Sequence, residues 1–230
     1  MKNLGIIAFA MLIWMSCGTK SNRIELSDGP RRAEILFLGH ESTHHDSEKL
    51  MPILARHLFQ KGINLTYTAD PNDLNEEKLR LYDGLIIYAN HEAISAEQEV
   101  ALKNYVEGGK ALIPIHSASF CFQNSDWFIK TVGGQFSSHG TGEFSTSITD
   151  PSHPVMEGIS SFTTWDETYV HSQLNKDMTI LMERTEGDRK EPYTWVREQG
   201  KGRVFYTAYG HDERTWNQPE FQKLVANGVL

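Results

Sequence analysis

The chain has 230 residues, 39% of them hydrophobic, which is enough for one sizeable core, so we expect a single folded domain. Its formal net charge of −8 lacks the basic character that a nucleic-acid partner requires, so we expect no nucleic acid to bind. The sequence contains no run of lysine or arginine that would hold it on an anionic membrane by charge.

The N-terminal residues follow the pattern of an export signal. Lys2 precedes an apolar run over residues 4–15, which is too short to span a bilayer, and Cys17 follows closely. This pattern resembles a bacterial lipoprotein signal, and it predicts a signal peptide over residues 1–17, lipidation of Cys17 and a polar tether over residues 18–32. A plain secretory signal and an uncleaved anchor are the alternatives.

The folded domain is then expected over residues 33–230, exported and anchored in the bacterial cell envelope, facing the periplasm or the cell surface. We expect it to touch the membrane only through the lipid on Cys17. A lipidated Cys17 leaves Cys121 without a disulfide partner in the chain. Cys121 is interpreted as a small apolar core residue, with a reactive thiol as the alternative.

The first half of the domain alternates short apolar runs with amphipathic segments. Asp46 suits the N-cap of a helix in which Leu50 and Leu54 share an apolar face, and Ser95-x-x-Gln98 is a capping-box pattern. The order of these segments is typical of a doubly wound, mainly parallel sheet with helices on both faces. Expected strands cover residues 34–39, 63–69, 84–89 and 111–115, and expected helices cover residues 46–62, 74–81 and 95–109.

The second half begins with a predicted helix over residues 126–132 and then changes character. Glycine, proline and aspartate turns separate strand-like segments, and a helix over residues 219–229 closes the chain. The predicted fold class is therefore α/β, with added β segments in the C-terminal half. The strand-like segments are residues 144–149, 179–183, 193–197 and 202–208.

Histidines gather where the predicted parallel strands end. Because the carboxyl ends of parallel strands meet at one edge of a sheet, these side chains are expected to lie close together and to mark a ligand site. Histidine suits acid–base chemistry near neutral pH and is a common metal ligand, whereas any one of them could be an ordinary loop residue. The residues are His40, His44, His45, His91, His116 and His211, with His116 at the centre.

Two acidic segments are candidate partners for these histidines. In His211-Asp212-Glu213, either acid could orient the imidazole or cap the following helix. Glu167 belongs to an acidic segment, residues 166–169, between two strand-like segments, which could equally be a solvated turn. A metal site assembled from separate loops is possible, although no His-Glu-x-x-His motif is present.

Six short motifs occur in an order that resembles the ThuA family, named for trehalose utilisation. The resemblance covers the chain from about Arg32 to Leu230. The motifs are Ile115-His116-Ser117-Ala118, Val132-Gly133-Gly134-Gln135-Phe136-x-x-His139, Asp150-x-x-His153-Pro154-Val155, Asp166-Glu167-Thr168-Tyr169, Gly200-Lys201-Gly202-Arg203-Val204-Phe205-Tyr206 and Gly210-His211-Asp212.

The resemblance implies a flavodoxin-like sheet with a class I glutamine amidotransferase-like fold. Amidotransferases carry cysteine at the nucleophile elbow, where this chain has His116, and a His-x-Glu pair near the position of His211. Because histidine cannot form the acyl-thioester, glutamine hydrolysis is not expected. ThuA relatives are associated with disaccharides and often with oxidoreductases that make 3-keto sugars. Elimination or hydration at a 3-keto sugar needs positioned acids and bases, and a divalent metal ion would help by polarising the ketone.

The predicted function is therefore acid–base or metal-assisted chemistry on a trehalose-like disaccharide or a 3-keto sugar, with a small-molecule sugar as the partner. A non-catalytic carbohydrate-binding module and a hydrolase using Cys121 are the alternatives. Predicted catalytic residues are His116, Glu167 and His211, of which His116 and His211 are also the candidate ligands of a divalent metal ion. Predicted substrate-binding residues are His45, Asn90, His91, Ser117, His139, Tyr169 and Asp212.

Overall fold

The computed structural model of the protein describes residues 31–40, 42 and 44–230. The predicted signal peptide, Cys17 and the tether up to residue 30 lie outside the described residues. One compact unit spans Arg32–Leu230. Within the part of the chain that the structure describes, no helix has the length and apolar character needed to cross a membrane.

Strands and helices alternate in the first half of this unit, and strands dominate its second half. The strands are β1 (Ala33–Leu38), β2 (Ile63–Thr68), β3 (Gly84–Ile87), β4 (Ala111–Pro114), β5 (Gln135–Ile148), β6 (Thr163–Ser172), β7 (Thr179–Glu186), β8 (Arg189–Gln199) and β9 (Gly202–Thr207). The helices are α1 (Ser47–Gln60), α2 (Glu76–Leu79), α3 (Ala96–Glu107), α4 (Asp126–Val132), α5 (Glu213–Trp216) and α6 (Pro219–Val229), and short 3₁₀ turns are η1 (Pro71–Asp73), η2 (His116–Phe120) and η3 (Pro154–Met156).

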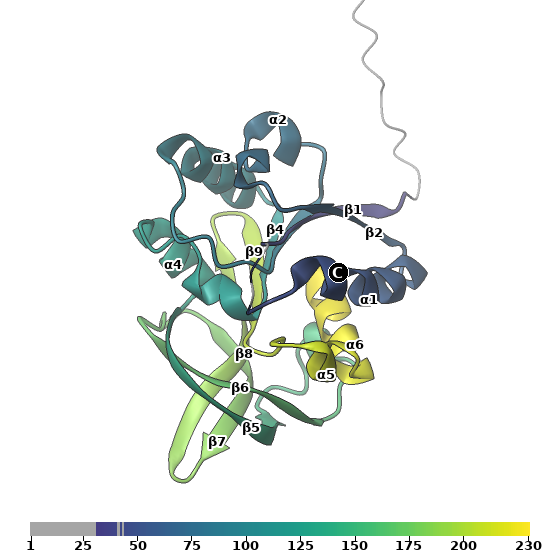
Figure 1. Ribbon diagram of the computed structural model, residues 1–230, viewed down its shortest axis with the longest axis vertical. Helices are drawn as coiled ribbons and strands as arrows, with labels where there is room; N and C mark the ends of the chain where they lie inside the picture. The colour runs from purple at the N-terminus through teal and green to yellow at the C-terminus, as the bar shows by residue number, and fades with distance from the viewer. Residues whose placement is uncertain (1–30, 41, 43) are drawn as a thin grey trace, which may run out of the picture. The chain divides into compact units, whose positions relative to one another are not determined.

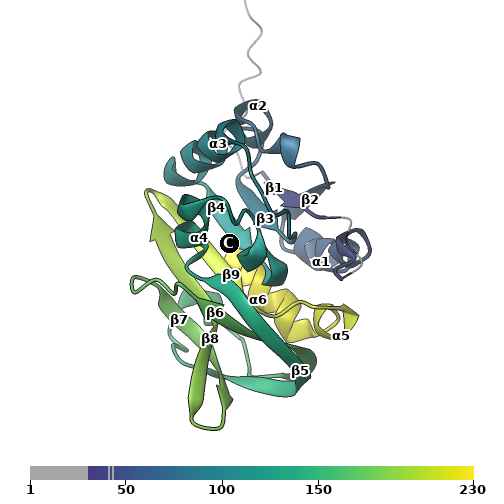
Figure 2. The same ribbon diagram turned by 60° about the vertical axis from the view of Figure 1, so that its left-hand side comes forward.

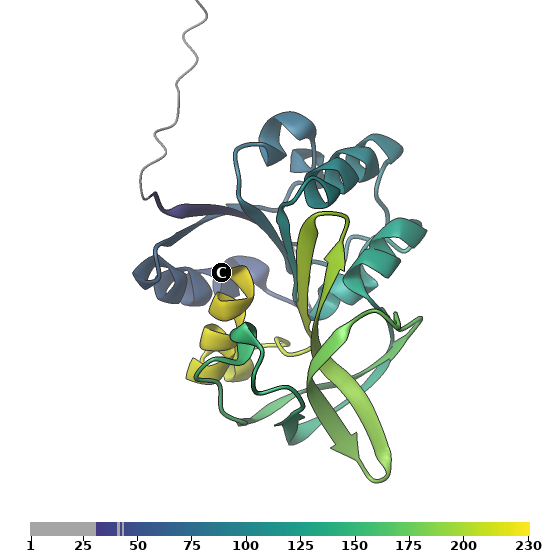
Figure 3. The same cartoon turned by 180° about the vertical axis from the view of Figure 1, so that it is seen from behind.

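The described strands form one mixed sheet in the order β2-β1-β3-β4-β9-β8-β7-β5-β6. The pairs from β2 to β9 are parallel, and those from β9 to β6 are antiparallel. Helices α1, α5 and α6 lie on one side of the parallel strands and α2, α3 and α4 on the other (Figures 1 and 2). The β7–β8 hairpin extends away from the parallel strands (Figure 3). The predicted α/β class is confirmed.

Local sequence signals account for the helix boundaries. The Asp46 side chain accepts a hydrogen bond from the Lys49 amide at the start of α1, and Ser95 and Gln98 form the predicted reciprocal capping box of α3. The apolar runs of β1, β3 and β4 are buried because helices cover both faces of these strands.

Two expectations about the second half are wrong. Strand β5 begins at Gln135, well before the expected residue 144, and residues 166–169 lie inside β6 rather than on a turn. The first half of β5 is rich in serine, threonine and glycine, so it has no apolar alternation to reveal a strand. It is held by antiparallel pairing with β6, which places Thr141 opposite Glu167.

Candidate functional site

His116 occupies a sharp turn at the end of β4. Its φ of +50° is in the left-handed region, which non-glycine residues seldom adopt and which frequently marks a functional position. The ring is fully buried, and its Nδ1 lies 2.7 Å from the Ala208 carbonyl oxygen. A carbonyl can only accept, so Nδ1 carries a proton, and in the neutral ring Nε2 is left with its lone pair.

Glu167 projects from β6 into the same space. One carboxylate oxygen, Oε2, lies 3.2 Å from His116 Nε2, and the other, Oε1, lies 3.3 Å from His211 Nδ1 and 3.5 Å from His139 Nδ1. Burial raises the pKa of the Glu167 carboxyl, but contacts with His116 and His211, which donate to the carboxylate when their rings are protonated, outweigh this and leave the pKa well below its usual range. The contact with Glu167 in turn raises the pKa of His211. Glu167 is therefore an anion at neutral pH.

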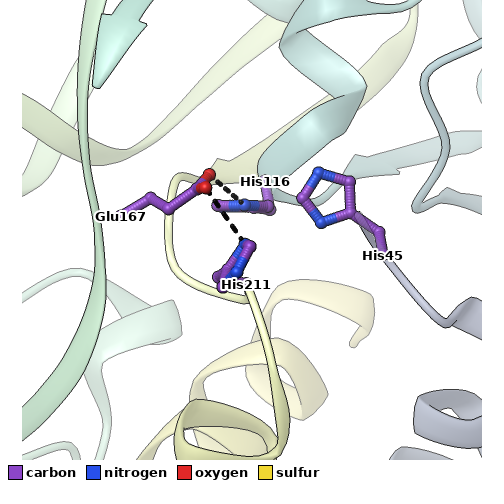
Figure 4. A group of neighbouring side chains, drawn as sticks. All are labelled: His45, His116, Glu167 and His211. Carbon is purple, nitrogen blue, oxygen red and sulfur yellow. Dashed lines mark ion pairs between the residues drawn. The ribbon is translucent and has the colours of Figure 1, made fainter. Parts of the chain in front are cut away.

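His45 completes the cluster from the loop before α1. Its buried ring meets the rings of His116 and His211 edge-on, at centroid distances of 5.0 Å and 5.3 Å. Burial, and then the neighbouring His116 and His211, lower the pKa of His45 to about 3, so its ring is neutral at physiological pH. Figure 4 shows His45 on the side of His116 away from Glu167.

The cluster presents several buried ring nitrogens that are not hydrogen-bonded. His45 Nδ1, His116 Nε2 and His211 Nδ1 have no hydrogen-bond partner among the described residues. One ligand atom from each of these histidines and one from Glu167 lie within 4.8 Å of one another. Buried polar atoms without partners destabilise a fold, so this arrangement calls for a further group between them.

A divalent metal ion fits this donor set. Imidazole nitrogens and a carboxylate oxygen are zinc ligands, and bonds of about 2.0–2.1 Å in a tetrahedron put ligand atoms about 3.3–3.4 Å apart. The contacts of His116 and His211 with Glu167, at 3.2 Å and 3.3 Å, are close to that spacing. A cation would also separate the Nε2 lone pair of His116 from the Glu167 carboxylate.

A second carboxylate, Asp166, holds two parts of the cluster in place. It is completely buried and accepts hydrogen bonds from the amides of Gly210 at 2.8 Å and His211 at 3.1 Å. It also accepts from the Thr215 hydroxyl at 2.7 Å and from the amide of Glu167 at 2.8 Å. Asp166 thus connects the loop carrying His211 to the strand carrying Glu167 through hydrogen bonds. No such role was predicted for Asp166 from the sequence.

The acid that contacts His211 is Glu167, not one of its sequence neighbours. Asp212 is the N-cap of α5 and pairs with Arg214, and Glu213 pairs with Lys49 on α1. The capping alternative for the acidic turn is therefore the correct one for Asp212.

The remaining predicted site residues divide into two groups. Tyr169 stacks on His116 with ring centroids 4.2 Å apart, and Ser117 follows His116 as a buried residue. Asn90 and His91 instead contact His40: the His40 and His91 rings are 4.2 Å apart, and Asn90 Oδ1 accepts from His40 Nδ1. Asn90 and His91 thus belong to a separate group around His40, at the same edge of the sheet.

Cys121 has the environment of a core residue. Its side chain is 1% exposed, its thiol donates to the Ala89 carbonyl oxygen at 2.9 Å, and burial raises the pKa of the thiol far above its ordinary value. These features argue against a nucleophilic role for Cys121.

A groove of about 960 Å³ lies elsewhere in the unit, lined by residues that include His153, Arg197, Arg203 and Phe205. None of the clustered histidines lines it. The clustered histidines therefore follow the ends of β1, β4 and β9, and Glu167 reaches them from β6, so the cluster lies outside this groove.

Comparisons with known proteins agree with this architecture. The family model described as ThuA, trehalose utilisation, matches residues 34–230. No curated protein matches the sequence. A ThuA-like protein from Bacteroides uniformis has a similar structure, with 21% sequence identity, a TM-score of 0.71 and coverage of 90% of this chain and 93% of that chain.

Two further structures extend the comparison. A ThuA-like protein from Parabacteroides merdae is 16% identical with a TM-score of 0.73, covering 86% of this chain and 89% of that chain. A β-galactosidase from Rahnella sp. R3 is 13% identical with a TM-score of 0.61, covering 85% of this chain but only 31% of the enzyme. At these identities the likeness concerns the fold alone.

Proposed function

Because the chain belongs to the ThuA family of trehalose utilisation, we propose that it is a metal-dependent enzyme acting on a disaccharide or keto-sugar derivative. The metal ligands in this proposal are His45, His116, His211 and Glu167. The observation that carries it is the convergence, on an anionic carboxylate, of buried ring nitrogens that have no hydrogen-bond partner among the described residues. The sequence had suggested His116 and His211 as ligands, and the geometry supports adding His45 and Glu167.

We also infer that the fold is the flavodoxin-like, doubly wound arrangement of class I glutamine amidotransferases. The parallel strand order β2-β1-β3-β4-β9 is consistent with the order of flavodoxin-like sheets. His116 follows β4 in a left-handed conformation, as a nucleophile does on its strained elbow. With histidine at this position, the elbow supplies a nitrogen ligand in place of a thiol nucleophile.

The surrounding residues would fix the ligands and handle protons. A bound divalent ion supplies a Lewis acid that polarises a ketone oxygen of the substrate. The Ala208 carbonyl holds the tautomer of His116, and Tyr169 stacks on its ring and fixes the ring plane.

His139 is the candidate base in this proposal. Its Nδ1 lies 3.1 Å from the Gly140 carbonyl oxygen and donates to it, so Nε2 of the neutral ring has a free lone pair. The side chain is 37% exposed, which leaves it open to a substrate. It could take a proton from the carbon next to a ketone, an acidified position, while Glu167 stays charged beside it.

Metal binding by the full chain tests the ligand assignment. The chelator-treated protein is titrated with Zn²⁺ by calorimetry, alongside the variants His116→Ala, His211→Ala and Glu167→Gln. We expect about one equivalent to bind the native protein and each variant to lose affinity by more than about 10-fold. His153→Ala is the control, because that histidine caps η3 outside the cluster, and its affinity should not change. Failure of the native protein to bind any divalent ion contradicts the proposal.

Turnover of a 3-keto-disaccharide tests the reaction. His139→Asn should lower the rate constant by about 10²–10⁴-fold, as expected for a lost general base, with Zn²⁺ affinity unchanged. Tight sugar binding that is insensitive to chelators and accompanied by no turnover would favour the carbohydrate-binding module instead.

We further propose export and a lipid anchor on Cys17, on the strength of the signal-like N-terminus. Labelled fatty acid supplied to expressing cells should enter the native protein and not Cys17→Ser. Equal labelling of both proteins would contradict the anchor.

A further inference from the structure

Behind His116 lies a chain of buried polar side chains that the proposed chemistry does not use. His171 on β6 places its Nε2 2.9 Å from the Tyr206 hydroxyl on β9. The Tyr206 oxygen is 3.1 Å from the His116 carbonyl oxygen and 3.0 Å from Ser119 Oγ, which is itself 3.2 Å from the same carbonyl. His171, Tyr206 and Ser119 are each at most 6% exposed.

The direction of the hydrogen bonds follows from what each group can do. His171 Nδ1 has no hydrogen-bond partner in the described part of the chain, and the rings of Trp195 and Tyr206 meet the imidazole edge-on. Burial, and then the proximity of His116, lower the pKa of His171 to about 3, so the ring is neutral and carries one N–H.

A buried N–H without an acceptor is among the rarest features of native proteins, so the proton belongs on Nε2 rather than on Nδ1. Nε2–H of His171 then donates to the Tyr206 oxygen. The single Tyr206 hydrogen is left to point at the His116 carbonyl or at Ser119, which also donates to that carbonyl.

His116 needs such support because of its backbone. A left-handed φ of +50° costs a non-glycine residue on the order of 1–3 kcal/mol and persists only where the surroundings fix it. The Ala208 carbonyl fixes the ring through Nδ1, and Tyr206 and Ser119 fix the backbone through the carbonyl. Together these contacts aim Nε2 at Glu167.

We propose that His171 is a positioning residue for His116. By donating from Nε2 to Tyr206, it orients the tyrosine hydroxyl toward the His116 carbonyl and keeps the elbow in the conformation that presents Nε2 to Glu167. Within the described residues, no hydrogen bond or ion pair joins the His171 side chain to Glu167 or to the other proposed ligands. Its hydrogen bond runs to Tyr206, and its influence on His116 passes through that tyrosine.

The test compares His171→Gln, His171→Leu and Tyr206→Phe in the full chain. Glutamine can place an amide N–H where His171 has Nε2–H, whereas leucine cannot donate. The matched control is Tyr105→Phe, which removes another buried hydroxyl that donates to a backbone carbonyl. That carbonyl belongs to Tyr82, at 3.3 Å, which lies before the start of β3, whereas His116 follows the end of β4. Zn²⁺ affinity is measured by calorimetry, and the free energy of unfolding is measured in urea for every variant.

This readout rests on the proposed metal function. His171→Leu and Tyr206→Phe should weaken Zn²⁺ binding by about 10–100-fold, the range found when residues supporting a metal ligand are removed. His171→Gln should recover most of the affinity, and Tyr105→Phe should lose stability without losing affinity. Native affinity in folded His171→Leu, or no recovery in His171→Gln, would overturn the proposal.

A second readout separates this inference from the metal proposal. Long-range ¹H–¹⁵N spectra of the metal-free protein report which ring nitrogen of His116 carries the proton. The native protein should show a single Nδ1–H tautomer, and His171→Leu should show altered or mixed His116 signals. If the native chain binds no Zn²⁺, the metal proposal fails while the spectra still decide the role of His171. Identical His116 signals in both proteins would overturn it.

Discussion

Replacing Asp166 by asparagine tests how the two halves of the candidate site are joined. The carboxylate accepts from Gly210 and Thr215 at Oδ2 and from Glu167 and His211 at Oδ1. An amide offers one acceptor oxygen, and its NH₂ group cannot accept the donors at the other position. Asparagine must therefore leave one pair of donors facing its NH₂ group.

The structure indicates which pair is lost. The Thr215 hydroxyl can turn to Thr164 Oγ1 at 3.0 Å, so placing the NH₂ group at the Oδ2 position leaves only the Gly210 amide unsatisfied. An unsatisfied buried donor costs about 1–3 kcal/mol, and each of the two remaining bonds weakens by about 1 kcal/mol when its acceptor loses its charge. We therefore expect Asp166→Asn to lower the free energy of unfolding by about 3–5 kcal/mol.

Urea unfolding with linear extrapolation measures this difference. Asp212→Asn is the control, because the amide oxygen keeps the cap of α5, and it should cost less than about 1 kcal/mol. Thr215→Val removes one donor and leaves the carboxylate satisfied by three amides, so it should cost about 1 kcal/mol. An unfolding midpoint of Asp166→Asn equal to that of the native protein would refute the reasoning.

Three further predictions concern the core and its pH dependence. Iodoacetamide should modify Cys121 only after unfolding, as peptide mapping would show, because the side chain is 1% exposed; rapid labelling of the native protein would speak against burial. Gly202→Ala places a Cβ 2.1 Å from the Val106 carbonyl oxygen and should destabilise by about 1–3 kcal/mol or more, whereas Gly142→Ala meets nothing within 4 Å and should be mild by comparison; equal urea midpoints would contradict this. Burial lowers the pKa of His171 in the folded state to about 3, so the unfolded chain binds the extra proton as pH falls below about 6.5. The contribution of His171 to the free energy of unfolding is thus intact above pH ~6.5 and falls by up to about 1.4 kcal/mol per pH unit toward pH ~3. The free energy of unfolding of His171→Gln should therefore decline less steeply with falling pH. Parallel declines for the native protein and the variant would contradict the lowered pKa of His171.

The parallel half of the sheet could be predicted because its signals are local. The apolar runs of β1 and β3 and the capping box at Ser95 depend on neighbours in sequence, and each was placed to within a few residues. The first half of strand β5 could not be predicted, because residues such as Gly140 and Gly142 favour a strand only when β6 is alongside. Its stability comes from a partner about 30 residues away along the chain, which no local pattern encodes.

The same distinction explains what was missed in the site. His116 and His211 were found because each follows a strand, and strand ends share an edge. The proposed ligand role of His45 and the hydrogen bonds that Asp166 accepts depend on side-chain directions that only the folded chain defines. Asp166 and Glu167 are neighbours on one strand, so their side chains leave opposite faces, and one can hold the His211 loop while the other faces its ring. In the expected turn, residues 166–169 would lack the strand alternation that separates the supporting carboxylate of Asp166 from the proposed ligand carboxylate of Glu167.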